Sequence, residues 1–319
     1  MLIVDREMTQ VKIIVPATTA NLGAGFDCIG AALSLYNEFE FAFSDSSQTN
    51  KLKITVTGTE ADKVSIDEDN LLYKSFRKLY QQIDRTVPNV AIEIKLGVPL
   101  SRGLGSSATA IVGGLLGANY LAGNPLTSVE IEELAIAIEG HPDNVIPALR
   151  GDCQLSVGEM GNWQICPIPW HQDIIPVVAI PNFELSTEEA RSVLPTEIPR
   201  SDAIFNISRM GLLVRGLATN HSSWLSTALE DKLHQPYRQK LIHGYQKVKT
   251  AAIEAGAYGM VISGAGPTLL ALTNSTQVKG VVTAMKSAWE QIGINADVRS
   301  LKIDTQGAKV VEFSPSVSS

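Results

Sequence analysis

The sequence predicts an α+β protein of two domains, in which a mixed sheet covered by helices is followed by an α/β sandwich of the ferredoxin type. The chain has 319 residues, more than one hydrophobic core usually organises, and 45% of them are apolar, which is enough for two cores. A proline-rich passage over residues 166–181 separates two units with different patterns of strands and helices. We therefore expect one domain over residues 1–165 and a second over residues 166–319.

The first unit begins with four strand-like runs that are rich in β-branched or aromatic residues and show partial alternation, at residues 11–15, 38–43, 52–58 and 90–96. Residues 70–83 place apolar side chains at helical spacing, and residues 106–121 form a helix of small residues whose glycines permit close packing against a sheet. Thr127 and Glu130 form a capping box for a third helix, which ends at Glu139. These helices are expected to cover one face of the sheet.

The second unit mixes strands and helices in an order that suggests a split α/β sandwich. Strands are predicted at residues 177–180, 259–262, 269–273 and 296–303, and helices at 201–218, 237–255 and 277–292.

Composition excludes several classes of protein. The net charge of -7 and the absence of a Lys/Arg stripe argue against a nucleic-acid or anionic-membrane partner. The three cysteines, Cys28, Cys153 and Cys166, show no C-x-x-C spacing, so they predict neither a disulfide framework nor a zinc site but buried thiols in a reducing compartment. No apolar run reaches the length of a spanning helix, and residues 1–7 are too short and acidic for a secretion signal. We expect a cytoplasmic protein.

The most informative segment for function is residues 99–110, in which Gly103 and Gly105 lead into Ser106 and Ser107 and then into the small-residue helix. Glycine lets the main chain approach a bulky anion, and a helix start has unpaired N–H groups that attract one. The pattern indicates a phosphate-binding loop, without the lysine of a P-loop or a G-x-G-x-x-G fingerprint. Taken alone, it also fits an ordinary glycine loop capped by serine.

Two more segments carry glycines beside polar residues. Residues 259–268 place Gly264 and Gly266 between two expected strands, which fits a tight turn as well as a ligand contact. Residues 16–30 place Asn21 and Asp27 just after the first strand, where loops often carry function, although these side chains also form local turns. Both interpretations stay open at this point.

Charged residues suggest where a cation and a carboxylate could bind. Glu139 ends a helix, where a carboxylate opposes the helix dipole by about 0.3–1 kcal/mol. A Mg²⁺ ion would offset this cost, and so would exposure to solvent. Arg191 and Arg238 each lie beside an expected helix, and arginine holds carboxylates through two parallel hydrogen bonds, although a single arginine is also an ordinary surface charge. His141 alone is typical of a structural hydrogen-bonding residue.

Together, residues 16–30, 99–110 and 259–268 resemble the three ordered motifs of the GHMP kinases, which phosphorylate small molecules. Residues 20–27, 139–144 and 186–191 and the pair Tyr237–Arg238 are similar to the homoserine kinases of that superfamily. The resemblance implies the two-domain GHMP kinase fold, with ATP and Mg²⁺ as cofactors. It also implies phosphorylation of L-homoserine to O-phospho-L-homoserine on the way to threonine, and a homodimer, since related kinases are commonly dimers.

The resemblance also implies roles for single residues. Those expected to bind the nucleotide are Asn70, Pro99, Leu100, Ser101, Arg102, Gly103, Leu104, Gly105, Ser106 and Ser107, and those expected to hold Mg²⁺ are Ser107 and Glu139. Those expected around L-homoserine are Asn21, Asp27, His141, Asn144, Thr187, Arg191, Arg238 and Gly264, with both arginines on its carboxylate. Asp27 and Asn144 are the expected catalytic residues.

Position 144 is an amide, whereas mevalonate kinase relatives are thought to use an aspartate as base. An amide cannot take and keep a proton, and phosphoryl transfer depends mostly on alignment and charge neutralisation. We therefore expect Asp27 and Asn144 to orient the hydroxyl without acting as a strong base. Two alternatives remain, namely a kinase of this fold acting on mevalonate or shikimate, and a sensor that binds ATP and a metabolite without transferring phosphate.

Overall fold

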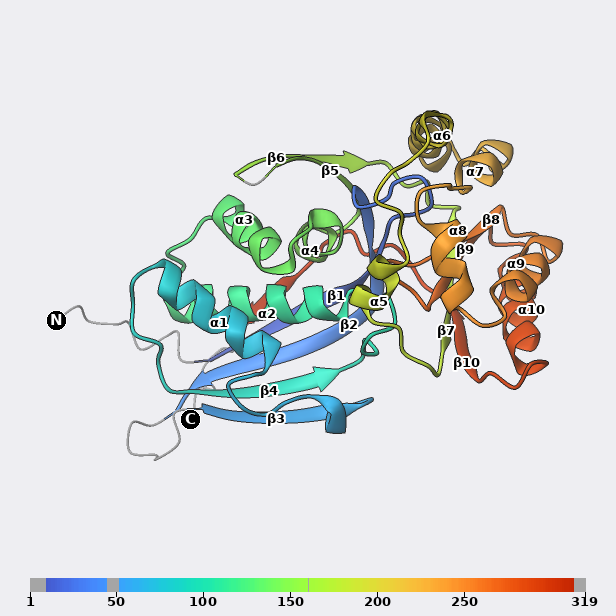
Figure 1. The fold of residues 1–319 in the computed structure, drawn as a ribbon. Helices are drawn as coiled ribbons and strands as arrows, with labels where there is room; N and C mark the ends of the chain where they lie inside the picture. The colour runs from blue at the N-terminus through green and yellow to red at the C-terminus, as the bar shows by residue number, and fades with distance from the viewer. Residues whose placement is uncertain (1–9, 45–51, 160, 313–319) are drawn as a thin grey trace.

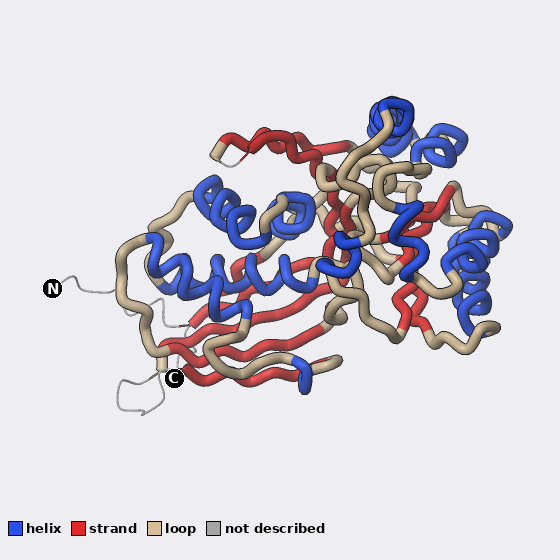
Figure 2. The backbone as a smooth tube through the Cα atoms, viewed as in Figure 1, coloured by secondary structure: helices blue, strands red, loops and turns tan. Residues whose placement is uncertain are grey.

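The computed structural model describes residues 10–44, 52–159 and 161–312, so the opening segment considered for a secretion signal lies outside the described residues. The strands form two separate sheets (Figure 2). In the first sheet the order is β11–β1–β2–β4–β3, and the hairpin β5–β6 pairs with β2. Its strands are β1 (Gln10–Ala20), β2 (Ile29–Phe43), β3 (Leu52–Gly58), β4 (Val90–Leu96), β5 (Cys153–Glu159), β6 (Asn162–Ile168) and β11 (Lys309–Glu312).

Four helices cover one face of this sheet, namely the three that were expected and α4, which was not predicted (Figure 1). They are α1 (Leu71–Gln82), α2 (Ser106–Leu121), α3 (Ser128–Glu139) and α4 (Pro142–Arg150). The capping box of Thr127 and Glu130 at the start of α3 is present. The helix predicted over residues 106–121 is confirmed with the same bounds.

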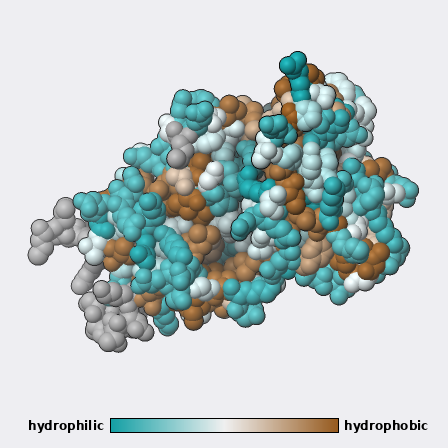
Figure 3. All heavy atoms as spheres, viewed as in Figure 1, coloured by the Kyte–Doolittle hydropathy of each residue, from teal (hydrophilic) through white to brown (hydrophobic). Residues whose placement is uncertain are grey.

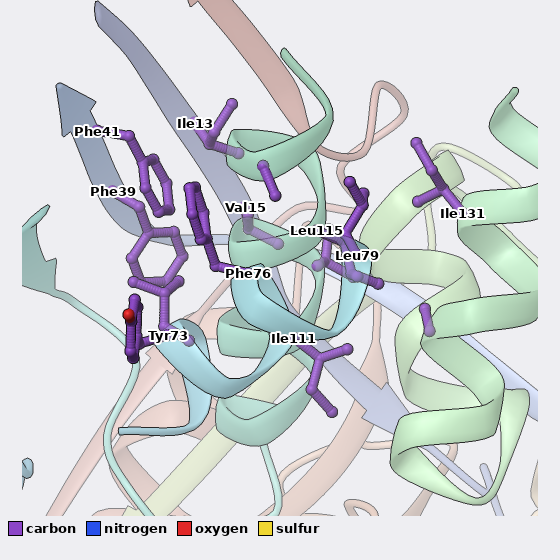
Figure 4. Close-up of a cluster of buried hydrophobic side chains, with 14 of the residues drawn as sticks. Ile13, Val15, Phe39, Phe41, Tyr73, Phe76, Leu79, Ile111, Leu115 and Ile131 are labelled. Atoms are coloured by element: carbon purple, nitrogen blue, oxygen red, sulfur yellow. The ribbon is translucent and has the colours of Figure 1, made fainter. Parts of the chain in front are cut away.

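Helix α2 lies directly on the sheet because it has glycines where it crosses β2. A Cβ atom on Gly113 or Gly117 would come within 2.4 Å of the ring of Phe39 or Phe41, respectively. The ring of Phe41 also stacks on Phe76 of α1 at 5.6 Å between centroids, and these rings form part of the first core (Figure 4). Close packing of this kind fixes the position of α2, and therefore of its first turn.

The second domain has the predicted ferredoxin-like topology. Its antiparallel sheet has the order β10–β7–β9–β8, with two helices in the β-α-β-β-α-β sequence and further helices inserted after β7. Its elements are β7 (Ile175–Pro181), α5 (Thr187–Ser192), α6 (Arg200–Thr219), α7 (Ser222–Ala228), α8 (Gln235–Arg238), α9 (Tyr245–Glu254), β8 (Gly259–Ile262), β9 (Leu269–Thr273), α10 (Val278–Glu290) and β10 (Ala296–Ser300).

Both faces of the second sheet are covered, which explains its continuous apolar strands. Along β7, Val177 and Ala179 pack in the cluster formed with α9 and α10. Val178 and Ile180 point to the other face, into a cluster that includes α6, α7 and residues of the first domain such as Leu104. The two domains therefore share a hydrophobic interface, next to which the cavity described below lies.

Two sequence expectations need correction. Residues 237–255 are not one helix, because Gly244 has φ +79° and separates α8 and a short 3-10 turn from α9; a Cβ there would lie 2.3 Å from Ile292 Cδ1. The strand expected at 296–303 ends at Ser300. The chain then returns to the first sheet as β11, which no pattern predicted, like the hairpin β5–β6. The boundary after residue 165 stays a prediction, and β6 continues across it to Ile168.

Apolar residues on the face drawn in Figure 3 lie in separate patches among hydrophilic ones. Within the described residues, no helix combines the length and the apolar character needed to cross a bilayer.

Candidate active site

A cavity of about 380 Å³ lies where the two domains meet. It is lined by the first turns of α2 and α4, the loop after β1, residues of α5 and α8, and the β8–β9 turn. The three glycine-containing segments singled out in the sequence converge here through main-chain hydrogen bonds. The N–H of Thr18 donates to the carbonyl of Leu104 at 3.0 Å, that of Gly264 to Ala20 at 3.1 Å, and that of Thr268 to Arg102 at 3.2 Å.

The first turn of α2 has the form of an anion-binding site. Its N-cap is Gly105, with φ +67° and no side chain to cap the helix, so the serine-capped loop considered above is not what the chain forms. A Cβ on Gly105 would lie 2.0 Å from Thr18 Oγ1, and one on Gly103 would lie 2.3 Å from the carbonyl oxygen of Ser263. Only glycine fits both places, and the uncapped N–H groups of the helix face the cavity, where an anion would accept their hydrogen bonds.

A hydroxyl and a carboxylate lie together at this helix start. Ser107 Oγ donates to Glu139 Oε1 at 2.7 Å. Burial raises the pKa of Glu139, against the opposing effects of the Ser107 hydrogen bond and the His141 charge. Both groups supply oxygen ligands, and a partly buried carboxylate gains from a bound cation. The pair therefore fits a Mg²⁺ site that is completed by phosphate oxygens.

The first turn of α4 brings a histidine, an aspartate and an amide to the wall of the cavity. His141 Nδ1 lies 2.5 Å from Asp143 Oδ1, and Asn144 Nδ2 donates to the same oxygen at 3.3 Å. Burial lowers the pKa of His141, but the hydrogen bond and charge of Asp143 outweigh it, so this pKa is raised overall. Asp143 is 2% exposed, so its charge is held among these partners.

Two arginines from the second domain reach the cavity in different ways. Arg191 of α5 forms a two-pronged ion pair with Asp27, with both N–O distances at 3.1 Å, across the domain boundary. Arg238 of α8 is 1% exposed and donates to the carbonyls of Ala190 and Gly264. Burial lowers the pKa of Arg238, partly offset by the charge of Asp27. The cavity thus has fixed positive charges beside a carboxylate.

Comparisons with known proteins agree with this arrangement. Residues 70–152 match the profile of the GHMP kinase N-terminal domain and residues 203–291 that of the GHMP kinase C-terminal region. The homoserine kinase of Crocosphaera subtropica is 67% identical over 95% of this chain and 98% of its own. The chain belongs to the GHMP kinase family. The family and the two-domain fold expected from the three motifs are confirmed.

Other known proteins are also similar to this GHMP kinase. The homoserine kinase of Trichodesmium erythraeum is 61% identical, over 94% of this chain and 98% of its own. The crystal structure of homoserine kinase from Cytophaga hutchinsonii has a TM-score of 0.86 and 31% identity, covering 98% of this chain and all of that one. Mevalonate kinase of L. major, at 16% identity with a TM-score of 0.71 over 92% of this chain and 96% of that one, shares the fold.

Most of the residues predicted for the site of this GHMP kinase line the one cavity. From the first domain these are Asn21, Asp27, Asn70, Leu100, Ser101, Arg102, Gly103, Gly105, Ser106, Ser107, Glu139, His141 and Asn144, and from the second Thr187, Arg191, Arg238 and Gly264. Pro99 and Leu104 are not among the lining residues, and the Leu104 side chain packs in the core at 1% exposure.

Two predicted nucleotide ligands use their side chains in the fold itself. The guanidinium of Arg102 donates to the carbonyls of Pro181 and Leu100 and pairs with Glu60 at 3.2 Å, so this side chain fixes the loop between the domains. Asn70 is the N-cap of α1, and its Oδ1 accepts from the first turn while its Nδ2 donates to Ser65. Their nucleotide contacts stay predictions.

Sequence reasoning missed three residues of the cavity region. Asp143 lies inside the polar segment 139–144 and could have been included on that ground. Asn37 lines the cavity and joins Thr109 of α2 to the N–H groups of Gly97 and Val98, and no local pattern marks it. Thr18 packs against Gly105 and belongs to the motif at residues 16–30, but nothing in the sequence marks it as different from its neighbours.

Proposed function

We propose that this GHMP kinase transfers the γ-phosphoryl group of ATP to the side-chain hydroxyl of L-homoserine, giving O-phospho-L-homoserine and ADP. The observation that carries the proposal is that an uncapped helix start, an oxygen-ligand pair and an aspartate–arginine pair share one cavity. The first two fit a Mg²⁺-bound triphosphate, and the third fits a zwitterion. Curated homoserine kinases at 54–67% identity support the same activity.

The phosphates of ATP would lie over Gly103 to Ser107, where main-chain N–H groups of the α2 start donate to them. Ser107 and Glu139 would hold Mg²⁺. When bound, this ion neutralises phosphate charge and so lowers the barrier to transfer. The backbone of the β8–β9 turn, with Gly264 and Gly266 at positive φ, would close over the reacting groups without side chains in the way.

L-Homoserine carries an ammonium, a carboxylate and a hydroxyl. Arg191 and Arg238 would bind its carboxylate, and Asp27 is a suitable partner for its ammonium. Because Asp27 and Arg191 are paired with each other in this structure, the substrate would insert between them. Asn21, His141 and Thr187 line the same cavity.

The hydroxyl oxygen would form the new bond to phosphorus while the bond to the β-phosphate oxygen breaks and ADP leaves. Asn144 cannot accept and keep the hydroxyl proton, and Asp27 would be paired with the ammonium of the substrate, so the proton would pass to an oxygen of the transferred phosphoryl group. This sequence balances without a strong general base. It requires alignment above all, which Asn144 and Asp27 would supply.

The test is ADP release by the purified protein with Mg²⁺-ATP. We expect release with L-homoserine and none above background with mevalonate, shikimate or L-threonine. Equal release with all four compounds, or with mevalonate instead, would refute the substrate assignment. Tight ATP binding with no release under any condition would favour a sensor.

The proposal includes a homodimer in the cytoplasm. The location is supported by Cys28, Cys153 and Cys166, which are free thiols in the structure. Of the three, only Cys153 is buried as expected, since Cys28 is half-buried and Cys166 is exposed. Light scattering would test the dimer, since a mass near twice 34.3 kDa supports it and a mass near 34.3 kDa refutes it.

A further inference from the structure

We propose that Thr18, buried beneath the phosphate-binding loop, is a positioning residue that fixes the amide of Asn144 for phosphoryl transfer. The inference rests on the proposed function, in which Asn144 faces the reacting hydroxyl. Thr18 Oγ1 donates to Asn144 Oδ1 at 2.7 Å, and the two residues are 126 positions apart in the chain. Thr18 is completely buried and Asn144 is 9% exposed, so water cannot readily replace this bond.

The contacts on both sides of Asn144 determine which way its amide points. Its Oδ1 accepts from Thr18, and its Nδ2 donates to the carboxylate of Asp143 at 3.3 Å. The flipped amide would place its oxygen against the Asp143 carboxylate, where two acceptors repel each other. The orientation with Oδ1 on Thr18 is therefore the one that satisfies both neighbours.

This orientation decides what Asn144 can offer to a substrate. An amide nitrogen has two hydrogens, and one of them is used on Asp143. The second is left for the cavity, so Asn144 acts as a donor toward the oxygen on which negative charge develops. A donor held in place before the reaction stabilises that charge without reorganising, which is the most effective form of such a contact.

Thr18 also connects Asn144 to the phosphate-binding loop. Its N–H donates to Leu104, and its Oγ1 occupies the space that a side chain at Gly105 would need. The same residue thus touches the loop that would hold the phosphates and the amide that would meet the acceptor. Thr18 sets the spacing between donor and acceptor substrates although it does not line the cavity.

The experiment compares Thr18→Val, which keeps the shape and removes the hydroxyl, with Thr18→Ser, which keeps the hydroxyl. We expect T18V to lower kcat about 10- to 100-fold, toward the loss seen when one preorganised donor is removed, with the KM for ATP changed less than about twofold. T18S is expected to retain kcat within about threefold of wild type. Unfolding curves check that each variant folds, and Thr18→Ala replaces T18V if the latter does not.

A double-mutant cycle separates positioning from general stability. In an Asn144→Ala background, T18V should lower kcat no further, because the group that Thr18 orients is already absent. Full kcat in T18V, equal losses in T18S and T18V, or losses that multiply in the double variant would each overturn the inference. If the wild-type protein itself releases no ADP with L-homoserine, the proposed function fails instead, so the two failures are distinguishable.

Discussion

The Ser107–Glu139 pair gives the sharpest test of the metal site. Glu139→Gln removes a charge and little else, because the glutamine oxygen can still accept from Ser107 Oγ, which lies 2.7 Å from the carboxylate. If this carboxylate holds Mg²⁺, its charge contributes to transition-state stabilisation by about 3–4 kcal/mol, which corresponds to about 10²- to 10³-fold in kcat. We therefore expect E139Q to lose activity on that scale and to need more Mg²⁺ for half-maximal rate.

Without bound metal, the charge of Glu139 should lower the free energy of unfolding, whereas with Mg²⁺ bound the same charge should support activity. Because burial raises the pKa of Glu139, the folded protein favours its protonated form. The carboxylate therefore costs stability at neutral pH, and this cost disappears as the pH falls through the raised pKa. Relative to E139Q, the metal-free wild-type protein should become more stable on acidification.

The assays are ADP release across a Mg²⁺ titration, and urea unfolding with a chelator at pH 7 and pH 5. Glu133→Gln, on the exposed face of the same helix, is the matched control and should behave like wild type in both. An E139Q variant with unchanged kcat and unchanged Mg²⁺ dependence would refute the assignment of Glu139 as a metal ligand.

Three further variants test the loop and the substrate contacts. Gly105→Ala must adopt φ +67° and place a Cβ 2.0 Å from Thr18 Oγ1, so it should destabilise the protein by about 2–5 kcal/mol in urea unfolding, and wild-type stability would contradict this. Arg238→Lys loses the fork that donates to Ala190 and Gly264, so the KM for L-homoserine should rise about 10- to 100-fold while the KM for ATP stays constant; the reverse pattern would place Arg238 at the nucleotide. Asp27→Asn should lower kcat by a small factor if Asp27 orients the substrate, and a loss of several thousandfold would identify it as the base.

Local sequence patterns correctly predicted the elements that are determined by residues close together in the chain. The capping box fixes the start of α3, the small residues of α2 match its burial against Phe39 and Phe41, and Gly264 and Gly266 form the turn between β8 and β9. Residue spacing alone cannot show that segments far apart in the chain meet. The resemblance to the GHMP kinases predicted that the three motifs lie at one site. Without the resemblance, residues 99–110 also fitted an ordinary capped loop, and residues 259–268 also fitted a simple hairpin turn.

The rest depends on contacts between residues far apart in the chain. Strand β11 is four residues long and gains its partners only by returning to β1, so no local signal marks it. The hairpin β5–β6 was hidden because Pro167 lies in β6, where an edge strand tolerates a residue without an N–H donor. In the site, no local pattern predicts that the guanidinium of Arg102 bonds Glu60 and the carbonyl of Pro181, and its contact with the nucleotide stays a prediction.

The ion pair between Asp27 and Arg191 leads to a final prediction about which compounds the protein phosphorylates. Each side chain is more than a third exposed in the free protein, so the pair itself adds little to stability and is easily opened. A zwitterion that enters the cavity can give each partner a replacement charge. An analogue with only one charged group can replace only one of these two interactions, so binding it leaves either Asp27 or Arg191 without a partner.

We therefore expect 4-hydroxybutyrate, which lacks the ammonium, and 3-aminopropan-1-ol, which lacks the carboxylate, to be poor phosphoryl acceptors. A charge-assisted hydrogen bond contributes about 1.5–3 kcal/mol, so each analogue should lose at least about tenfold in kcat/KM relative to L-homoserine. In an Asp27→Ala variant the penalty for 4-hydroxybutyrate should shrink, because the carboxylate that required an ammonium is gone. Equal kcat/KM for 4-hydroxybutyrate and L-homoserine in the wild-type protein would show that Asp27 does not meet the ammonium, and that the aspartate–arginine pair serves only to join the domains.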